Sequence, residues 1–499
     1  GAEKIYMVKE LYRFYEQRNF TPIWMLGRYI PPKTESFTNC LLKSAEHGLL
    51  PEDYHLSSLN TFIQNATTSD EALEIDDVAK LEIMLSDAYL LLAQHYLMGK
   101  INPEDVAIEW YLGNLKDRSY DLVAHFNQAM TKDNLCASLE ELLPQSQAYK
   151  DLVENLKTYR WLQWSQQLPG DWSTLLQEGN GAPLVIDIKE RLQLMGDLPP
   201  GPIDHVFDKD LRKAVMRFQR RHGMHYDGVV RNNTIINLNV TAETRLQQIY
   251  ANLERWRWMP EGLGDTYIMI NVPEFTLRMF NNGQQTYQEL VIVGRERYPT
   301  PCFSDTMTYA VINPYWNVPR SIVEEEFIPQ LSYNEEYLVE NEIEVLYRGK
   351  PVDPKSKVWT IENSKDYWFR QSTGEKNPMG VVKFMFPNKY DIYLHDTSER
   401  ELFNNSRRSN SHGCIRVNEP VKLAGYIFRD YIDYSWDTTK VNSIIGTKEE
   451  MKLTFSKPLP IHVTYWTVFT DSKNNELNFR EDIYSWDENL YHALVKKLD

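Results

Sequence analysis

Cysteine is scarce in this sequence, with four residues among 499: Cys40, Cys136, Cys302 and Cys414. They are widely separated, so they offer neither the paired spacing of a metal site nor the density of a disulfide scaffold. Long apolar runs are also missing, since none approaches the roughly 18 residues that a membrane-spanning helix requires. Basic residues do not predominate: 54 Lys and Arg against 70 Asp and Glu give a net charge of −16. A nucleic-acid partner needs a basic face, and this balance argues against one.

Signal-peptide features are absent from residues 1–4, and we expect that a targeting segment has been removed. The composition that is present, 42% apolar and 25% charged, is typical of a globular protein. The length predicts about three domains.

The periodicity of apolar residues divides the chain. Residues 1–179 are predicted to form a helical domain, in which 81–98 carries leucines at three- and four-residue spacing. Residues 180–240 are predicted to form a small unit of about three helices, one of which begins at Asp208 and ends at Gly223. Residues 241–264 follow as a linking amphipathic helix. This division predicts helical accessory regions before the segment that carries the chemistry.

Strand signals dominate residues 265–450. Apolar runs at 267–272, 290–293, 381–386 and 390–394 predict strands, and Asn282-Gly283 predicts a two-residue hairpin turn. An insertion at about 321–375 interrupts them, and its first part, 321–345, holds eight Glu and no Lys or Arg. It is either a lid over a nearby site or a solvated acidic helix. Residues 451–499 are expected to complete the helical or the β domain.

Chemistry concentrates in the segment Ser411-His412-Gly413-Cys414-Ile415-Arg416-Val417. A thiol attacks a carbonyl as the thiolate, so it needs a base, and His395 lies 19 residues upstream at the end of the predicted strand 390–394. Backbone N–H groups near Gly413 and Cys414 are candidates to hold the oxyanion. The polar loop 396–410 predicts that Cys414 is exposed.

Several residues of this segment admit a second interpretation. His395, His412 and Cys414 could be three zinc ligands, but no Cys-x-x-Cys or His-x-x-x-His spacing completes such a set. His412 either pairs with the thiolate or orients the loop, and we prefer the orienting role. Arg416 either binds a substrate carboxylate or forms a structural ion pair, and we favour the substrate, to which Ser411 is also assigned.

The pattern from His395 through Ser411-His412-Gly413-Cys414-Ile415-Arg416 closely resembles the signature of L,D-transpeptidases of the YkuD type. Four neighbouring segments are similar to the large YcbB-like subfamily of Gram-negative bacteria. These segments are Asn313–Arg320, Asn377–Gly380, Lys383–Asn388 and Tyr393–Thr397.

Two further regions carry the resemblance. Phe207-Asp208, Phe218-Gln219 and Asp227-Gly228-Val229 look like a peptidoglycan-binding domain, although Val230 stands where a glycine is usual, and a purely structural role stays open. The stretch 14–20 resembles the N-terminal scaffold domain of the subfamily. The implied fold is multidomain α+β: a scaffold (1–179), a three-helix peptidoglycan-binding-like domain (180–240), a linking helix (241–264) and a mostly β catalytic domain (265–450) with a lid insertion.

The resemblance implies a two-step acyl transfer without metal or organic cofactor. Cys414, deprotonated by His395, would attack the amide between diaminopimelate and D-alanine in a tetrapeptide stem, and a second stem would resolve the thioester as a 3→3 cross-link. Cell-wall biogenesis and cell shape, an exported periplasmic or envelope location, carbapenem-type inhibitors and other wall-synthesis proteins as partners are implied with it.

Three alternatives remain open. Water or a cross-linked peptide as second substrate would make the protein an L,D-carboxypeptidase or endopeptidase. The same thioester could attach a lipoprotein to the wall. A wall-binding scaffold without catalysis is the alternative from another class.

Overall fold

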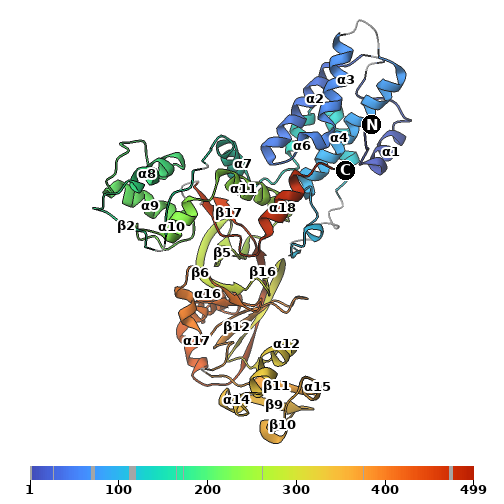
Figure 1. Cartoon of the computed structure of the whole chain (residues 1–499). Helices are drawn as coiled ribbons and strands as arrows, with labels where there is room; N and C mark the ends of the chain where they lie inside the picture. The colour runs from blue at the N-terminus through green and yellow to red at the C-terminus, as the bar shows by residue number, and fades with distance from the viewer. Residues whose placement is uncertain are drawn as a thin grey trace. The chain divides into compact units, whose positions relative to one another are not determined.

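The computed structural model describes residues 3–25, 27, 29–68, 73–111, 120–164, 166–171, 173–260, 262–374, 376–470 and 476–498. The chain forms two units, labelled along its course in Figure 1: unit 1 is Gly1–Glu261 with Trp466–Asp499, and unit 2 is Gly262–Tyr465. Two of the sequence predictions fall partly outside the described residues. They concern residues 1–2, in the stretch without signal-peptide features, and residue 375, the expected end of the insertion.

Unit 1 begins with a helical region built around α4 (Ile75–Met98), whose leucines are buried on nearly every side. The predicted helix at 81–98 is confirmed as part of α4, and its burial marks it as the central helix of this region. The other elements here are α1 (Val8–Glu16), α2 (Pro32–Lys43), α3 (Leu56–Thr68), β1 (Trp110–Tyr111), α5 (Leu122–Lys132), α6 (Leu135–Glu140) and α7 (Gln147–Tyr159).

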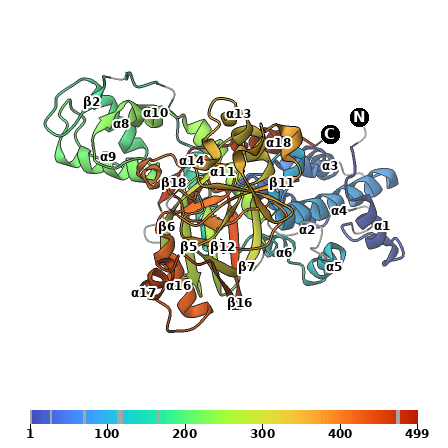
Figure 2. The same cartoon turned by 90° about the horizontal axis from the view of Figure 1, so that it is seen from below.

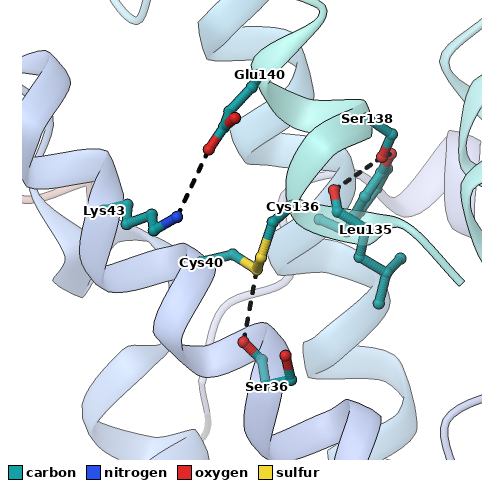
Figure 3. Close-up of a disulfide and its surroundings, with 8 residues drawn as sticks. Ser36, Cys40, Lys43, Leu135, Cys136, Ser138 and Glu140 are labelled. Carbon is teal, nitrogen blue, oxygen red and sulfur yellow. Dashed lines mark hydrogen bonds and ion pairs between the residues drawn. A yellow bond between two sulfur atoms is a disulfide. The ribbon is translucent and has the colours of Figure 1, made fainter.

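A disulfide joins Cys40 on α2 to Cys136 on α6, with 5.4 Å between the two Cα atoms. Figure 3 shows it between the two helices, beside the ion pair of Lys43 and Glu140, whose Nζ and Oε1 lie 3.6 Å apart. The sequence does not predict this disulfide, because Cys40 and Cys136 are 96 residues apart and only the fold brings them together.

The small helical region contains α8 (Leu184–Leu194), α9 (Lys209–Arg221) and α10 (Asn232–Leu238), with β2 (Leu175–Leu176) paired to β3 (Val230–Arg231). Asp208 caps α9 by accepting a hydrogen bond from the Leu211 N–H at 2.8 Å, as the sequence predicts. A common core of Val185, Ile188, Phe207, Leu211, Val215 and Phe218 closes the three-helix unit.

Unit 1 ends with α11 (Ala242–Arg257) and, after unit 2, β17 (Val468–Thr470), β18 (Leu477–Phe479) and α18 (Trp486–Val495). Buried polar contacts hold the returning segment to α11: Asn252 Nδ2 donates to Thr467 Oγ1 at 2.7 Å, and Arg255 pairs with Asp487 at 2.5 Å.

Unit 2 is a sheet that closes on itself. The strands run in the order β7–β12–β13–β15–β6–β5–β4–β16, and β16 pairs back with β7. Figure 1 labels β5, β6, β12 and β16 of this sheet. Their bounds are β4 (Thr266–Asn271), β5 (Thr276–Asn281), β6 (Gln284–Gly294), β7 (Cys302–Ile312), β12 (Val382–Met385), β13 (Leu394–His395), β14 (Ser409–Ser411), β15 (Ile415–Val417) and β16 (Met451–Thr464).

The β5–β6 hairpin turns at Asn282 and Gly283, which have φ of 47° and 75°, as the predicted two-residue turn requires. One face of the sheet is apolar, because Val382, Phe384, Leu394 and Ile415 are fully buried there. Helix α16 (Pro420–Tyr431) lies against this face, with the Phe384 and Phe428 rings 6.3 Å apart, and α17 (Thr438–Ile445) follows it. The opposite face of these strands is left for polar side chains.

The predicted strand at 390–394 is wrong in extent, since β13 contains only Leu394 and His395. The side chain of Asn388 accepts hydrogen bonds from the N–H groups of Tyr390 and Ile392, at 3.0 and 3.2 Å, and Asp391 has a φ of 54°. This turn occupies the residues that the apolar pattern assigned to a strand.

The insertion folds around its own small sheet, in the order β10–β9–β11–β8. Its core includes Val323, Phe327, Val345, Trp359 and Phe369, so it is not simply a solvated acidic helix. In Figure 1 it lies at one end of the large sheet, and in Figure 2 the molecule is seen from that end. The elements are β8 (Trp316–Asn317), α12 (Arg320–Ile322), the π-helical η5 (Val323–Phe327), α13 (Ile328–Leu331), α14 (Tyr337–Glu340), β9 (Ile343–Tyr347), β10 (Lys350–Val352), α15 (Ile361–Ser364) and β11 (Tyr367–Gln371).

Within the described ranges, no helix has both the length and the apolar character needed to cross a membrane.

Candidate active site

Strands β13 and β15 bring the predicted nucleophile and base onto one face of the sheet. They pair in parallel, with Leu394 opposite Ile415 and His395 opposite Arg416. Because side chains alternate along a strand, Cys414 and Arg416 point to the face opposite that of Ile415, the same face as His395. Tyr393 shares this face, and its ring centroid lies 5.7 Å from that of His395.

The loop that precedes Cys414 is fixed by hydroxyl groups. Ser411 Oγ donates to the carbonyl oxygen of Cys414 at 2.5 Å and accepts from the Gly413 N–H at 3.1 Å. Thr300 Oγ1, from the loop after β6, donates to the Gly413 carbonyl at 2.7 Å. Gly413 itself has a φ of 108°, which a residue with a side chain rarely adopts. These bonds set the direction in which the Cys414 side chain leaves the backbone.

The same geometry shows how two of the predicted residues are engaged. Ser411 is 2% exposed, and its hydroxyl forms its hydrogen bonds within the loop. The Gly413 N–H is engaged by Ser411, so it is not open to an oxyanion. In the described part of the chain, no hydrogen-bond acceptor is found for the Cys414 N–H, which leaves this group as the candidate donor.

Cys414 is half-buried, where the polar loop had predicted exposure. Its Sγ lies 3.6 Å from the carbonyl oxygen of Asp391. Burial raises the pKa of the Cys414 thiol to about 11, while hydrogen bonds from Tyr393 and the charge of Arg416 act in the opposite direction. At neutral pH the resting group is therefore the thiol.

His395 is 3% exposed, and its Nδ1 has no hydrogen-bond partner among the described residues. Burial, together with the charge of Arg416, lowers the pKa of His395 to about 3, against the opposing effect of hydrogen bonds with the backbone of Asp396 and Pro378. The imidazole is therefore neutral and able to accept a proton. Its strand is held by the Asp396 carboxylate, which accepts from the N–H groups of Val381 and Thr397 at 2.9 and 2.7 Å.

His412 points away from the thiol toward the insertion. Its Nε2 lies 2.7 Å from Glu326 Oε1 on η5 and 2.7 Å from an Arg295 guanidinium nitrogen. The neighbouring Glu325 accepts a hydrogen bond from the Tyr298 hydroxyl. Two acidic residues of the insertion thus contact the catalytic loop and the loop after β6.

Arg416 forms an ion pair with Glu399, as expected if Arg416 has a structural role. The side chain is 13% exposed, and its Nε has no hydrogen-bond partner among the described residues. This nitrogen is therefore a buried donor without a partner in the described part of the chain.

Tyr393, Thr300 and Glu326 contribute to the site, although the sequence gave none of them a role. Alternation with His395 could have indicated Tyr393. Thr300 and Glu326 precede the motif by roughly 90 to 110 residues. No local sequence pattern predicts their contacts with Gly413 and His412. Within the described residues, no group of three or more His, Cys, Asp or Glu side chains is arranged to hold a metal ion.

Three family models match the chain. Residues 265–433 match the L,D-transpeptidase catalytic domain of the YkuD family, residues 181–236 a domain described as "Putative peptidoglycan binding domain", and residues 9–156 a scaffold domain. The chain therefore carries a YkuD-type L,D-transpeptidase catalytic domain together with both accessory domains, and the resemblance drawn from its motifs is confirmed. The implied multidomain α+β fold is confirmed with it.

A curated relative is the "Putative L,D-transpeptidase" of Haemophilus influenzae, which is 31% identical over 258 residues. The match covers 50% of this chain and 51% of the relative, so the chain spans about half the length of the curated relative it matches.

Two solved structures are similar to parts of the chain. The L,D-transpeptidase from Stackebrandtia nassauensis is 12% identical, with 58% of this chain and 94% of that chain covered and a TM-score of 0.22. The L,D-transpeptidase from Xylanimonas cellulosilytica is 13% identical, with 59% and 100% covered and a TM-score of 0.17. The placement of the site residues rests on the geometry of this chain alone.

Proposed function

We propose that this protein is a cysteine acyltransferase that forms 3→3 cross-links between peptidoglycan stems. The observation that carries the proposal is the common face of His395, on β13, with Tyr393 and Cys414, which directly precede β13 and β15, within the segment matched by the catalytic-domain model. A nucleophile and a neutral base on one rigid sheet face are what acyl transfer through a thioester requires.

His395 takes the thiol proton at its unpartnered Nδ1 as Cys414 Sγ attacks the carbonyl carbon between diaminopimelate and D-alanine. The Cys414 N–H donates to the oxyanion that forms. When the tetrahedral intermediate collapses, the C–N bond breaks, His395 returns its proton to the amine, and D-alanine leaves. The amine of a second stem then attacks the thioester, and its proton passes through His395 as the thiol is restored.

The insertion is proposed as a lid that limits access of water to the thioester. Glu325 and Glu326 support this role, because they contact Tyr298 and His412 beside the catalytic loop. A peptidoglycan substrate implies an exported protein that acts at the cell envelope, with wall-synthesis proteins as partners. The thioester chemistry also implies that carbapenem-type inhibitors acylate Cys414, and no metal or organic cofactor enters these steps.

Incubation with purified disaccharide-tetrapeptides, followed by mass spectrometry, tests the proposal. Wild type should release D-alanine and form tetrapeptide–tripeptide dimers, whereas Cys414→Ala and His395→Ala should form none. Tripeptide without dimers would identify an L,D-carboxypeptidase instead. If wild type releases no D-alanine and a carbapenem leaves no adduct on Cys414, the catalytic proposal is wrong and a wall-binding role gains support.

A further inference from the structure

Three basic side chains form a row across the face that carries Cys414. On β12, Lys383 is opposite His395 of β13, and His395 is opposite Arg416 of β15. Residues that are opposite one another in a sheet point to the same side, and neighbouring strands lie about 4.8 Å apart. The row is therefore Lys383, His395 and Arg416, with His395 in the middle.

The three members of the row differ in charge and in partners. His395 is neutral, and the charge of Arg416 is balanced by Glu399. For Lys383, by contrast, no hydrogen bond or ion pair is found in the described part of the chain, and Glu450 is the carboxylate whose charge acts on it. Burial lowers the pKa of Lys383, which reflects the cost of holding an ammonium group half out of water without a partner.

The leaving group of the proposed reaction brings a carboxylate to this place. His395 protonates the leaving amine, so the released residue must lie beside the imidazole. The α-carboxylate of that residue is attached to the carbon next to the amine. Of the two cations that flank His395, Arg416 already has a carboxylate, and Lys383 does not.

We propose that Lys383 binds the terminal carboxylate of the donor stem and thereby restricts the donor to peptides that end in a free acid next to the scissile bond. This inference rests on the proposed function and adds a specificity-determining residue to it. An ion pair with the substrate offsets the desolvation of the Lys383 ammonium group only while a carboxylate is bound.

Paired donor peptides test the inference, one with a free terminal carboxylate and one with a terminal amide. Wild type should show a KM for the amide about 10- to 100-fold higher than for the acid, the loss typical of a charge-assisted hydrogen bond. Lys383→Gln should raise the KM for the acid by a similar factor, leave kcat largely unchanged and leave the KM for the amide unaffected. Lys383→Arg, which keeps the charge, should retain most of the preference.

Lys452→Gln is the matched control. Lys452 on β16 is opposite Val311 on β7, and Val311 is in turn opposite Lys383 on β12. Both lysines therefore lie in one cross-strand row. The Lys452 ammonium group instead sits over the Tyr309 ring, 4.0 Å from its centroid, and its removal should leave the preference for acid over amide as in wild type.

The outcomes separate this inference from the proposed function. If wild type turns over neither donor, the proposed function fails. If wild type is active and Lys383→Gln still prefers the acid, the carboxylate site is wrong while the function stands. A Lys383→Gln protein that loses kcat on both donors, or whose Cys414 reacts with iodoacetamide at an altered rate, would indicate a structural role and would also overturn the inference.

Discussion

Raising the pH should accelerate the alkylation of Cys414 by iodoacetamide about tenfold per unit from about pH 6 to 10. The reagent reacts with the thiolate, and burial raises the pKa of this thiol to about 11. At pH 7.5 a group of that pKa is ionised in roughly one molecule in 3,000, against about one in ten for a cysteine of ordinary pKa. The thiolate population at pH 7.5 is therefore about 300-fold below that of a free thiol, and alkylation at neutral pH should be slow.

Alkylation is readily assigned to one site. Cys302 is fully buried, and Cys40 and Cys136 form the disulfide, so the peptide that contains Cys414 should carry the early adduct in mass spectrometry. His395→Gln should leave the alkylation profile nearly unchanged, because the imidazole is neutral in wild type, yet slow acyl transfer from a peptide by about 10²- to 10⁴-fold.

A different pH profile would refute this account of the dyad. If the rate reached a plateau between about pH 6 and 8, the resting state would be a thiolate–imidazolium pair, as in cysteine sites of strongly lowered pKa. The base would then act before substrate arrives, and the assignment of proton transfer to the moment of attack would be wrong.

Three further predictions concern the fold and the insertion. Cys40→Ser with Cys136→Ser should lower the free energy of unfolding of unit 1 by up to about 4–5 kcal/mol in denaturant titrations, given the separation of 96 residues; a loss below about 1 kcal/mol would contradict this. Burial lowers the pKa of His95 to about 3, so the unfolded state binds more protons and the free energy of unfolding falls as the pH drops from 6.5 toward 3. At pH 4.5, His95→Gln should recover about 2–3 kcal/mol of this free energy in the same assay. Equal pH slopes for the two proteins would refute the prediction. Replacing 321–375 by a short linker should raise the ratio of hydrolysed to cross-linked product, measured by mass spectrometry, and an unchanged ratio would reject the lid.

Local signals in the sequence predicted the local structure well. The leucine spacing of 81–98, the cap at Asp208 and the turn at Asn282-Gly283 all correspond to what the structure contains, because each depends on residues within one or two turns of chain. The predicted strand at 390–394 is shorter in the structure for an equally local reason. The side chain of Asn388 accepts hydrogen bonds from the backbone of Tyr390 and Ile392, and these compete with strand pairing.

Contacts between distant segments could not be predicted in the same way. Closure of the sheet depends on β16, which pairs with β4 in parallel and with β7 antiparallel, across more than a hundred residues. The contact of Glu326 with His412 depends on that closure and on the fold of the insertion. For the site itself, the motif predicts Cys414 and His395 as nucleophile and base, whereas no local pattern predicts the hydrogen bond between the Gly413 N–H and the Ser411 hydroxyl.

Because residues 466–499 return to unit 1, unit 2 is a domain inserted into unit 1, and the chain passes between the two units twice. Thr467 and Asp487 supply partners to Asn252 and Arg255, which are buried in α11. A fragment of residues 262–499 would therefore contain β17, β18 and α18 without the helix α11 that they contact. Any fragment meant to carry the catalytic sheet by itself should stop near residue 465, and any fragment meant to carry unit 1 must bridge 261 to 466 with a new loop.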